Sequence, residues 1–327
     1  MDELSCEWYG QMKIVRLRDF DASLRLQDAL LVHSSFGSTF SHAYPEGKDE
    51  RDGYPISSDY GGLAMIEDGR LLSRISVCRL ELSSPHGVIR CCGIGGVGTR
   101  PGSGRRGLAR SLLREVHRVE RAAGSRYSLL YTSRSIVAHG LYESMGYHDI
   151  LDFPRAVRRV PTDHHYECGD DFEWGVATPP DYPHLRIIHS VSTHGWSGFT
   201  PRPPGWTPQH GDVFLLKERG KPSGYAVIER QGTSTACWEA LATDASSSIE
   251  LLRRVEAEGR GQWLVIGGGP FRMWSDLLQG PEWISEETSW GVLMACSLQE
   301  NKSREELVAS LGAGDVRRFA CFALDTF

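Results

Sequence analysis

Glycines and arginines concentrate in one stretch of the chain, where GIGGVGT is followed by RPGSGRRGLA (93–109). A helical pattern, RSLLREVHRVERA, comes directly after it. A glycine-rich strand that leads into a helix N-terminus leaves several backbone N–H groups without partners, and such groups bind phosphate oxygens. Gly107 and Ala109 allow close approach of a ligand to the backbone, and Arg105 and Arg106 add positive charge. The stretch therefore predicts a site for a phosphorylated cofactor.

Three kinds of phosphate site could use such a stretch, and residue spacing separates them. A Walker loop needs Lys and then Ser or Thr after its last glycine, whereas Gly107 is followed by Leu108 and Ala109. The dinucleotide pattern Gly-x-Gly-x-x-Gly occurs twice, but a chain with 36 glycines produces such matches by chance. The first match leads into Arg100 and Pro101 rather than a helix. The second match lacks a βαβ unit with an acidic residue closing the next strand. A third kind of phosphate site therefore has to be judged from the elements that follow the loop.

The elements after the loop come in a regular order. The helix 108–123 has one apolar and one charged face and stops at Gly124. A short apolar strand, 127–132, comes next, and a second helical segment, SIVAHGLYESMG, ends at Gly146 before Tyr147. A helix with one apolar face is expected to pack on a sheet. That face carries Leu108, Leu112, Leu113, Val116, Val119 and Ala123.

This order resembles the GNAT superfamily of N-acetyltransferases. Their cofactor loop reads Arg/Gln-x-x-Gly-x-Gly/Ala, and its end matches Gly107, Leu108 and Ala109. Their next helix carries Asn-x-x-Ala-x-x-Leu-Tyr-x-x-x-Gly-Phe/Tyr. Two positions depart from these motifs, because Gly104 stands at the leading Arg/Gln position and Ser135 at the Asn position. The second motif matches Ala138, Leu141, Tyr142, Gly146 and Tyr147.

The resemblance implies direct transfer of an acetyl group from acetyl-CoA, a co-substrate, to an amine, without a metal ion. It also implies that the pantetheine arm pairs with the strand end, while the pyrophosphate binds loop N–H groups at the positive end of the helix dipole. Tyr142 holds the position of the family's tyrosine acid, although its spacing with Leu141 and Met145 also suits a core aromatic residue. The implied cofactor-binding residues are Val97, Gly98, Thr99, Gly104, Arg105, Arg106, Gly107, Leu108, Ala109, Arg110 and Ser135.

The general base is harder to place from the sequence. Many relatives have a glutamate on the strand before the cofactor loop, but here that strand reads VIRCCGIGGVG and holds no carboxylate. Cys91 and Cys92 fit small buried hydrophobic residues better than bases. Other carboxylates lie in the polar loop 41–58, on the strand upstream and at the chain end, where a buried final strand with an exposed terminus is an alternative. They are Glu46, Asp49, Glu50, Asp52, Glu81 and the carboxyl group of Phe327.

The chain is long for one GNAT unit, and its 327 residues suit two domains. Periodicity lapses over 152–171, so we predict a catalytic domain over 1–155, a linker over 156–171 and a second domain over 172–327. We expect an α/β fold with mixed sheets.

The second half weakly repeats the first, with a hairpin pattern followed by a strand, a helix, a strand and a short helix. At the equivalent of the cofactor loop it reads TDASSSIELL, without glycine or arginine. The second domain is therefore predicted to be a degenerate GNAT-like domain without a cofactor site. Such a tandem is similar to enhanced-intracellular-survival-type acetyltransferases without their sterol-carrier-like domain.

Charge and composition bear on partners. A net charge of −6 gives no basic footprint for nucleic acid. Eight cysteines form no Cys-x-x-Cys pair, and His164, His165 and Cys168 are expected to be linker residues rather than zinc ligands. No apolar run is long enough for a membrane, so we expect a cytoplasmic protein, either a monomer or a homodimer.

The acceptor class stays open at this level. The acidic loop 41–55 favours a cationic small-molecule amine through charge complementarity, although exposed charge is usually only solvated surface. A longer acyl donor, a protein lysine as acceptor, and a non-catalytic CoA sensor or interaction scaffold are the alternatives.

Overall fold

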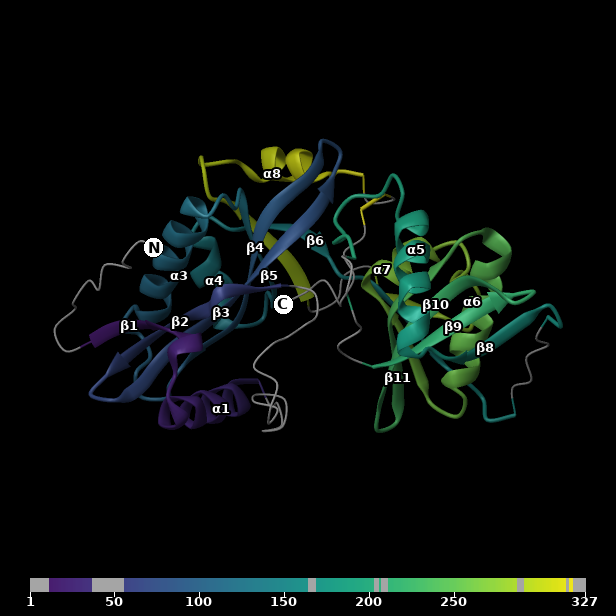
Figure 1. Ribbon diagram of the computed structural model, residues 1–327, viewed down its shortest axis with the longest axis horizontal. Helices are drawn as coiled ribbons and strands as arrows, with labels where there is room; N and C mark the ends of the chain where they lie inside the picture. Colours follow the sequence, from purple (N-terminus) through teal and green to yellow (C-terminus); the bar gives the residue numbers. More distant parts are fainter. Residues whose placement is uncertain are drawn as a thin grey trace.

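The computed structural model consists of two halves that use the same kinds of elements (Figure 1). The first half contains β1 (Met12–Arg16), η1 (Leu17–Asp19), α1 (Ala22–Phe36), β2 (Ile56–Glu67), β3 (Arg70–Ser84), β4 (Gly87–Thr99), α3 (Leu108–Ala122), β5 (Tyr127–Ser133), α4 (Val137–Glu143) and β6 (His148–Asp152). The residues that the structure describes are 12–36, 56–163, 169–202, 206, 211–286, 291–315 and 318–319.

The second half begins with a strand that directly follows the last strand of the first half. Its elements are β7 (Arg155–Arg159), β8 (Phe172–Val176), η2 (Pro179–Asp181), α5 (Tyr182–Ser192), β9 (Asp212–Glu218), β10 (Lys221–Gln231), β11 (Ser234–Ala242), α6 (Ala245–Glu258), β12 (Trp263–Gly267), α7 (Gly268–Met273), β13 (Ile284–Glu286), β14 (Gly291–Ser297) and α8 (Arg304–Leu311).

Each half builds a seven-stranded mixed sheet. The first sheet has the order β1-β2-β3-β4-β5-β14-β6, and the second has the order β13-β7-β12-β11-β10-β9-β8. The pairs β4–β5 and β11–β12 are parallel, and the other pairs are antiparallel. Read from β8, the second order corresponds strand by strand to the first: β8 to β13 take the places of β1 to β6, and β7 takes the place of β14. The predicted α/β class with two similar units in tandem is confirmed.

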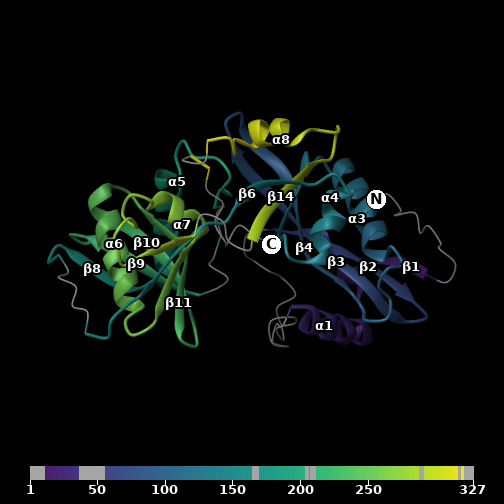
Figure 2. The same ribbon diagram turned by 180° about the vertical axis from the view of Figure 1, so that it is seen from behind.

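The strands form two consecutive sets of seven, β1 to β7 and β8 to β14, and each set gives its last strand to the sheet built by the first six of the opposite set. β14, near the end of the chain, lies between β5 and β6 of the first sheet, as Figure 2 shows in yellow. β7, which follows β6 in the chain, lies between β12 and β13 of the second sheet. The sequence GVLMACS of β14 is buried along almost its whole length, which suits a central strand covered on both faces.

This exchange corrects the predicted domain boundaries. The linker expected over 156–171 begins as strand β7, whose Ala156 and Arg158 are buried in the second half. The second domain expected over 172–327 includes β14, which belongs to the first sheet. The sequence pattern locates β14 but not the sheet it enters, because an apolar run is compatible with either sheet. It does not locate β7, whose short segment RAVRR falls where the periodicity lapses.

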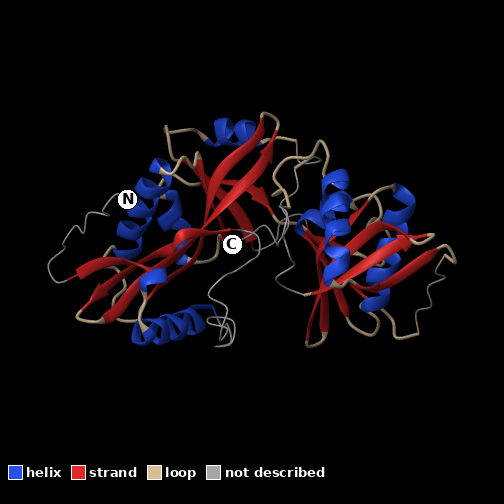
Figure 3. Cartoon of the chain, in the orientation of Figure 1, coloured by secondary structure: helices blue, strands red, loops and turns tan. Residues whose placement is uncertain are grey.

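Helices cover both faces of the first sheet (Figure 3). The apolar side chains of α3 form a core with β2, β3 and β4, as the sequence predicts. α1 packs on the other face, where Leu31 joins Ile66 and Leu71. A buried carboxylate, Glu120, fixes α3 to the sheet, because it accepts hydrogen bonds from the Tyr60 hydroxyl (2.8 Å) and the Arg79 guanidinium (3.3 Å). Burial beside Glu120 raises the pKa of Tyr60.

A shared hydrophobic core joins the two halves. It combines residues of β3 to β6, β14 and α8 with residues of α5, β9, β10 and β11. The end of β3 also exchanges backbone hydrogen bonds with the second half, between Ser83 N–H and the Phe199 carbonyl (2.9 Å) and between Gly198 N–H and the Ser83 carbonyl (2.9 Å). Gly198 is at φ +89°, and the ring of Phe319 lies where a side chain on it would project. The first and second sheets are therefore packed on one another as well as interleaved.

A network of polar groups links β14 and β5 to α3. His117 Nε2 lies 2.9 Å from the Tyr147 hydroxyl, which lies 2.6 Å from Ser128 Oγ on β5. Cys296 Sγ of β14 lies 3.9 Å from the same His117 nitrogen. Burial, together with Arg121, lowers the pKa of His117 to about 4. The imidazole is therefore neutral in the folded protein at neutral pH.

We expect this histidine to make stability depend on mild acid. Because its folded-state pKa is lowered, the unfolded chain takes up the proton first as pH falls below its ordinary value of 6.5. Stability should decline from about pH 6.5 to about pH 4, by on the order of 3 kcal/mol, and then level off with respect to this group. Urea unfolding midpoints of the wild type and His117→Gln measure it, with His86→Gln at the exposed β3–β4 turn as control. Equal pH slopes for all three proteins would contradict the prediction.

Candidate active site

The first sheet opens between its two parallel strands. β4 and β5 pair from Cys91–Tyr127 to Ile94–Leu130 and then separate. β4 stays paired with β3 as far as Thr99, and β5 stays paired with β14 as far as Ser133. The edges 95–99 and 131–133 therefore face each other without pairing, and we call this opening the fork. Backbone groups in such a position need a partner from outside the sheet.

The loop after β4 presents backbone N–H groups at the start of α3. Arg105 (φ +62°) and Gly107 (φ +76°) are both left-handed, on either side of Arg106. Alternation of this kind turns successive N–H groups to one side and forms a concave site for an anion. Gly107 is the N-cap of α3 and brings no side chain to it. The first N–H groups of α3, from Leu108 to Arg110, therefore have no partner within the helix.

The corresponding helix of the second half begins differently. Asp244 is the N-cap of α6, and its side chain accepts a hydrogen bond from Ser247 N–H (2.8 Å). Its carboxylate occupies the position that an anion takes at an open helix N-terminus. The fork region of that half also holds a buried ionic group, in which Glu239 pairs with Arg202 at 2.5 Å and accepts from the Tyr225 hydroxyl.

The three arginines predicted to bind cofactor have different surroundings. Arg106 forms an ion pair with Glu67 at the end of β2 (2.9 Å), which lowers the pKa of Glu67. Arg110 donates to Ser144 Oγ beyond α4 (2.8 Å). Arg105 is exposed and makes no ion pair with any residue that the structure describes. The positive charge expected from Arg106 is therefore already compensated, and Arg105 is the arginine left for a ligand.

The predicted strand-end residues divide between two roles. The Gly98 carbonyl accepts a hydrogen bond from Ser73 Oγ (2.9 Å), and Thr99 Oγ1 lies 3.0 Å from the same hydroxyl. These two positions are thus partly committed to β3. Val97 packs against the core under α3 and stands at the fork. Gly104 and Ser135 are both exposed, the first in the loop and the second directly after β5.

Tyr142 lies on α4 and belongs to the core on the α3 side of the first sheet. It is 6% exposed, and its ring meets that of Tyr147 edge to face at 5.8 Å between centroids. Burial raises its pKa to about 12, so the phenol keeps its proton at neutral pH. Its hydroxyl makes no hydrogen bond with a described residue. The side chain is therefore both a core aromatic residue and a neutral acid with a proton to donate.

The other face of the fork is bordered by α1 and by the second half. Cys91 is part of the core shared by the two halves, and Gly98 faces Leu31 of α1. Between them, Gly93 and Gly95 alternate onto the same face and bring no side chain. An opening lined by glycine backbone is suited to close approach of two reacting molecules.

Of the carboxylates considered as bases, the one within the described residues, Glu81, does not lie at the fork. Glu81 pairs in register with Arg90, on the part of β4 that precedes the fork, and is exposed. The residues Glu46, Asp49, Glu50, Asp52 and Phe327 lie outside the described residues. A polar pair that the sequence analysis did not single out, Asp28 and Arg74, lies at the fork instead. Its signal was a charged residue within the apolar patterns LLSRISV and LQDALLV.

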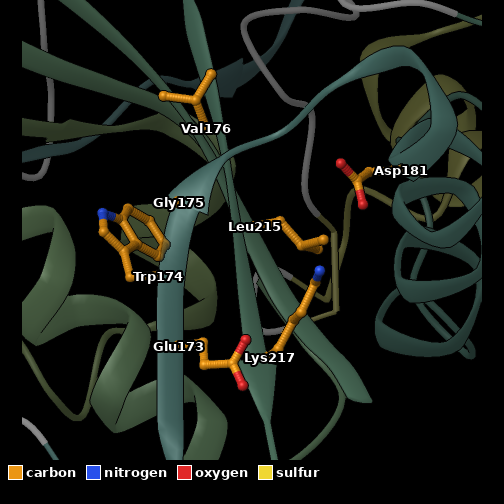
Figure 4. Close-up of a pocket in the computed structure, with 7 residues that line it drawn as sticks. All are labelled: Glu173, Trp174, Gly175, Val176, Asp181, Leu215 and Lys217. Atoms are coloured by element: carbon orange, nitrogen blue, oxygen red, sulfur yellow. The ribbon is translucent and has the colours of Figure 1, made fainter. Parts of the chain in front are cut away.

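Two hollows among the described residues lie in the second half, away from the fork. The larger, of about 360 Å³, is lined by residues of β7, α6 and the segment 277–283. The smaller, of about 140 Å³, lies at the outer strand β8, where Glu173 and Lys217 are register partners; Figure 4 shows the residues that line it. The volume of the smaller hollow is below that of ordinary ligand pockets. No three His, Cys, Asp or Glu side chains of the described ranges gather as metal ligands do. His164, His165 and Cys168 lie outside those ranges. Among the described helices, none has both the length and the apolar character to cross a membrane.

Sequence comparison identifies the domain that carries the fork. Residues 18–150 match the family described as an acetyltransferase (GNAT) domain. The chain contains a GNAT acetyltransferase domain. This match supports an acyltransferase, and GNAT domains generally use acetyl-CoA. No curated protein matches the chain at the sequence level.

Solved structures extend the similarity of fold beyond the GNAT domain. A GCN5-related N-acetyltransferase from Anabaena variabilis shares 13% identity, with a TM-score of 0.67 over 88% of this chain and 73% of that chain. One from Kribbella flavida shares 15% identity, with a TM-score of 0.63 over 88% and 72%. Eis1 from Mycobacterium abscessus shares 13% identity, with a TM-score of 0.57 over 88% and 74%. These similarities span both halves of the chain and support the predicted tandem architecture.

The different surroundings of Arg105 and Arg106 lead to a prediction about coenzyme A. Arg105→Gln should weaken CoA binding about tenfold, because it removes the uncompensated charge beside the loop N–H groups. Arg106→Gln should change the affinity less than about threefold, since Glu67 already neutralises that charge. Calorimetric titration at two salt concentrations measures both, and the Arg105 effect should shrink at high salt. Equal losses in the two variants would contradict this assignment.

Proposed function

We propose that the protein transfers an acetyl group from acetyl-CoA to a primary amine of a small molecule by direct attack. The observation that carries the proposal is the fork itself, together with the open N-terminus of α3 and the free hydroxyl of Tyr142. The same set of positions in the second half is closed by Asp244 and by the buried pair of Arg202 and Glu239. One cofactor site per chain follows from this contrast.

The residues present fit acetyl-CoA in two respects. The N–H groups of the loop and of the first turn of α3 are free to receive the pyrophosphate, with Arg105 beside them. The unpaired edge of β4 at the fork offers backbone groups to the amides of the pantetheine arm. When bound, the cofactor supplies an activated thioester carbonyl.

Tyr142 would act as the acid at the thiolate. A leaving thiolate is stabilised when a nearby acid gives it a proton, and such groups contribute about 10²- to 10⁴-fold to rates. The raised pKa of Tyr142 keeps the phenol protonated at neutral pH, so that a proton is available when the thiolate leaves. The amine must lose its own proton, and because β4 carries no carboxylate, we propose water as the base that accepts it.

A small acceptor is favoured over a lysine on a folded protein by the surroundings of the open face. α1 borders that face on one side through Leu31, and the shared core borders it on the other through Cys91. The Arg272 guanidinium of α7 also donates to the Asp152 carbonyl (3.2 Å), which holds the second half against the end of β6. An acceptor has to approach between these two boundaries.

Because β4 carries no carboxylate that could act as a base, one other function is favoured, that of a CoA-binding sensor without turnover. The two functions differ in thiol release. Incubation with acetyl-CoA and a panel of polyamines, aminoglycosides and lysine peptides, followed by a thiol reagent, separates them. Thiol release with a small amine supports the proposal, and saturable binding without release for any amine supports the sensor.

For the enzyme we expect Tyr142→Phe to lower kcat about 100-fold while the dissociation constant for CoA stays within about twofold. The lost group is the proton donor, whereas the ring and its packing remain. Because burial holds the pKa of Tyr142 at about 12, the wild type should show no alkaline loss of kcat from this group up to about pH 10. Tyr127→Phe, a buried tyrosine before the fork, is the matched control. Unchanged kcat in Tyr142→Phe would remove Tyr142 as the acid.

A further inference from the structure

The bulge in β4 at the fork is held by a side chain from the neighbouring strand. The register between β3 and β4 shifts between Arg74–Gly98 and Ser76–Gly95, which leaves Gly96 in the bulge. Gly96 is left-handed, at φ +52°. A Cβ atom on Gly96 would lie 2.6 Å from Nη1 of Arg74 and 2.9 Å from Oγ of Ser76. The guanidinium of Arg74 is therefore packed directly against the backbone of the bulge.

Arg74 is held in this place by Asp28 of α1. Its Nε lies 2.8 Å from Asp28 Oδ1, and the two side chains are only 10% and 4% exposed. The backbone of Arg74 is at the same time the register partner of Gly98. One residue thus contacts the bulge with its side chain and the strand beyond the bulge with its backbone.

Stability alone does not account for a buried ion pair at this position. Removing two charges from water costs several kcal/mol per ion, and well-packed apolar residues often replace such pairs without loss. At this position the ion pair contacts the bulge of β4, so it can fix the geometry of the fork. The bulge follows the last β4–β5 pair, at Ile94, and it sets the direction of the backbone groups from Gly96 onward.

We propose that Arg74, oriented by Asp28, is a positioning residue that holds the bulge of β4 in the conformation that binds the pantetheine arm and places the thioester in the fork. This inference rests on the proposed function, since it assigns a role within the same acyl-CoA site. In this proposal Arg74 acts through the backbone of Gly96. Its effect should therefore appear in the affinity for acetyl-CoA more than in the folding of the chain.

The test replaces the pair by a neutral one of similar volume, Arg74→Met with Asp28→Asn. The melting temperature should stay within a few degrees of the wild type, whereas the dissociation constant for acetyl-CoA should rise about tenfold. The matched control is Arg158→Met with Glu256→Gln, a similarly buried pair in the second half with side chains 9% exposed. That control should leave acetyl-CoA binding unchanged.

A second variant, Arg74→Lys, keeps the positive charge beside Asp28 but loses the planar group that contacts Gly96. It should also bind acetyl-CoA more weakly, and its KM should rise more than its kcat falls. Wild-type affinity in a folded neutral pair, or in Arg74→Lys, would overturn the positioning role. Absence of acetyl-CoA binding by the folded wild type is a different result, because it would overturn the proposed function and the positioning role with it.

Discussion

The reciprocal exchange of β7 and β14 is the constraint on which the rest of the structure depends. Each sheet is completed by the last strand of the opposite set of seven, β14 for β1 to β6 and β7 for β8 to β13, so neither set has all its hydrogen-bonded neighbours by itself. β14 is the second neighbour of β5, and β5 forms one side of the fork. The geometry of the candidate active site is thus fixed by residues that lie about half the chain apart in the sequence. The shared core then holds the two sheets at a defined separation.

The two halves share one topology but differ in the residues at the fork and at the start of the following helix. In the first, the parallel strands separate around glycines, and the following helix starts at a left-handed glycine with open N–H groups. In the second, Glu239 and Arg202 fill the equivalent interior, and Asp244 closes the helix. The difference lies in a few side chains rather than in topology. The second half contributes fully to the shared core although its helix N-terminus is closed by Asp244.

Much of this could be read from the sequence, and the remainder has identifiable physical reasons. The periodicity of α3, the glycines around Gly107 and the order of elements up to Tyr147 depend on local chemistry, which the sequence expresses directly. The partner of β14 could not be predicted, because its apolar pattern carries no information on which sheet it enters. The pairing of Arg106 with Glu67 joins residues far apart in the chain, so spacing alone could not reveal it. The same is true of the contact between Arg74 and Gly96.

The position of β14 has a consequence for synthesis on the ribosome. The strands of the GNAT domain emerge early, but the edge of β5 stays without its neighbour until residues 291–297 have left the exit tunnel. Until then, β5 and β6 present unpaired backbone groups on apolar strands, which is the arrangement that promotes aggregation of nascent chains. The second half therefore serves the first as a late folding partner. The fork of the first half is therefore completed only after residues 291–297 have been made.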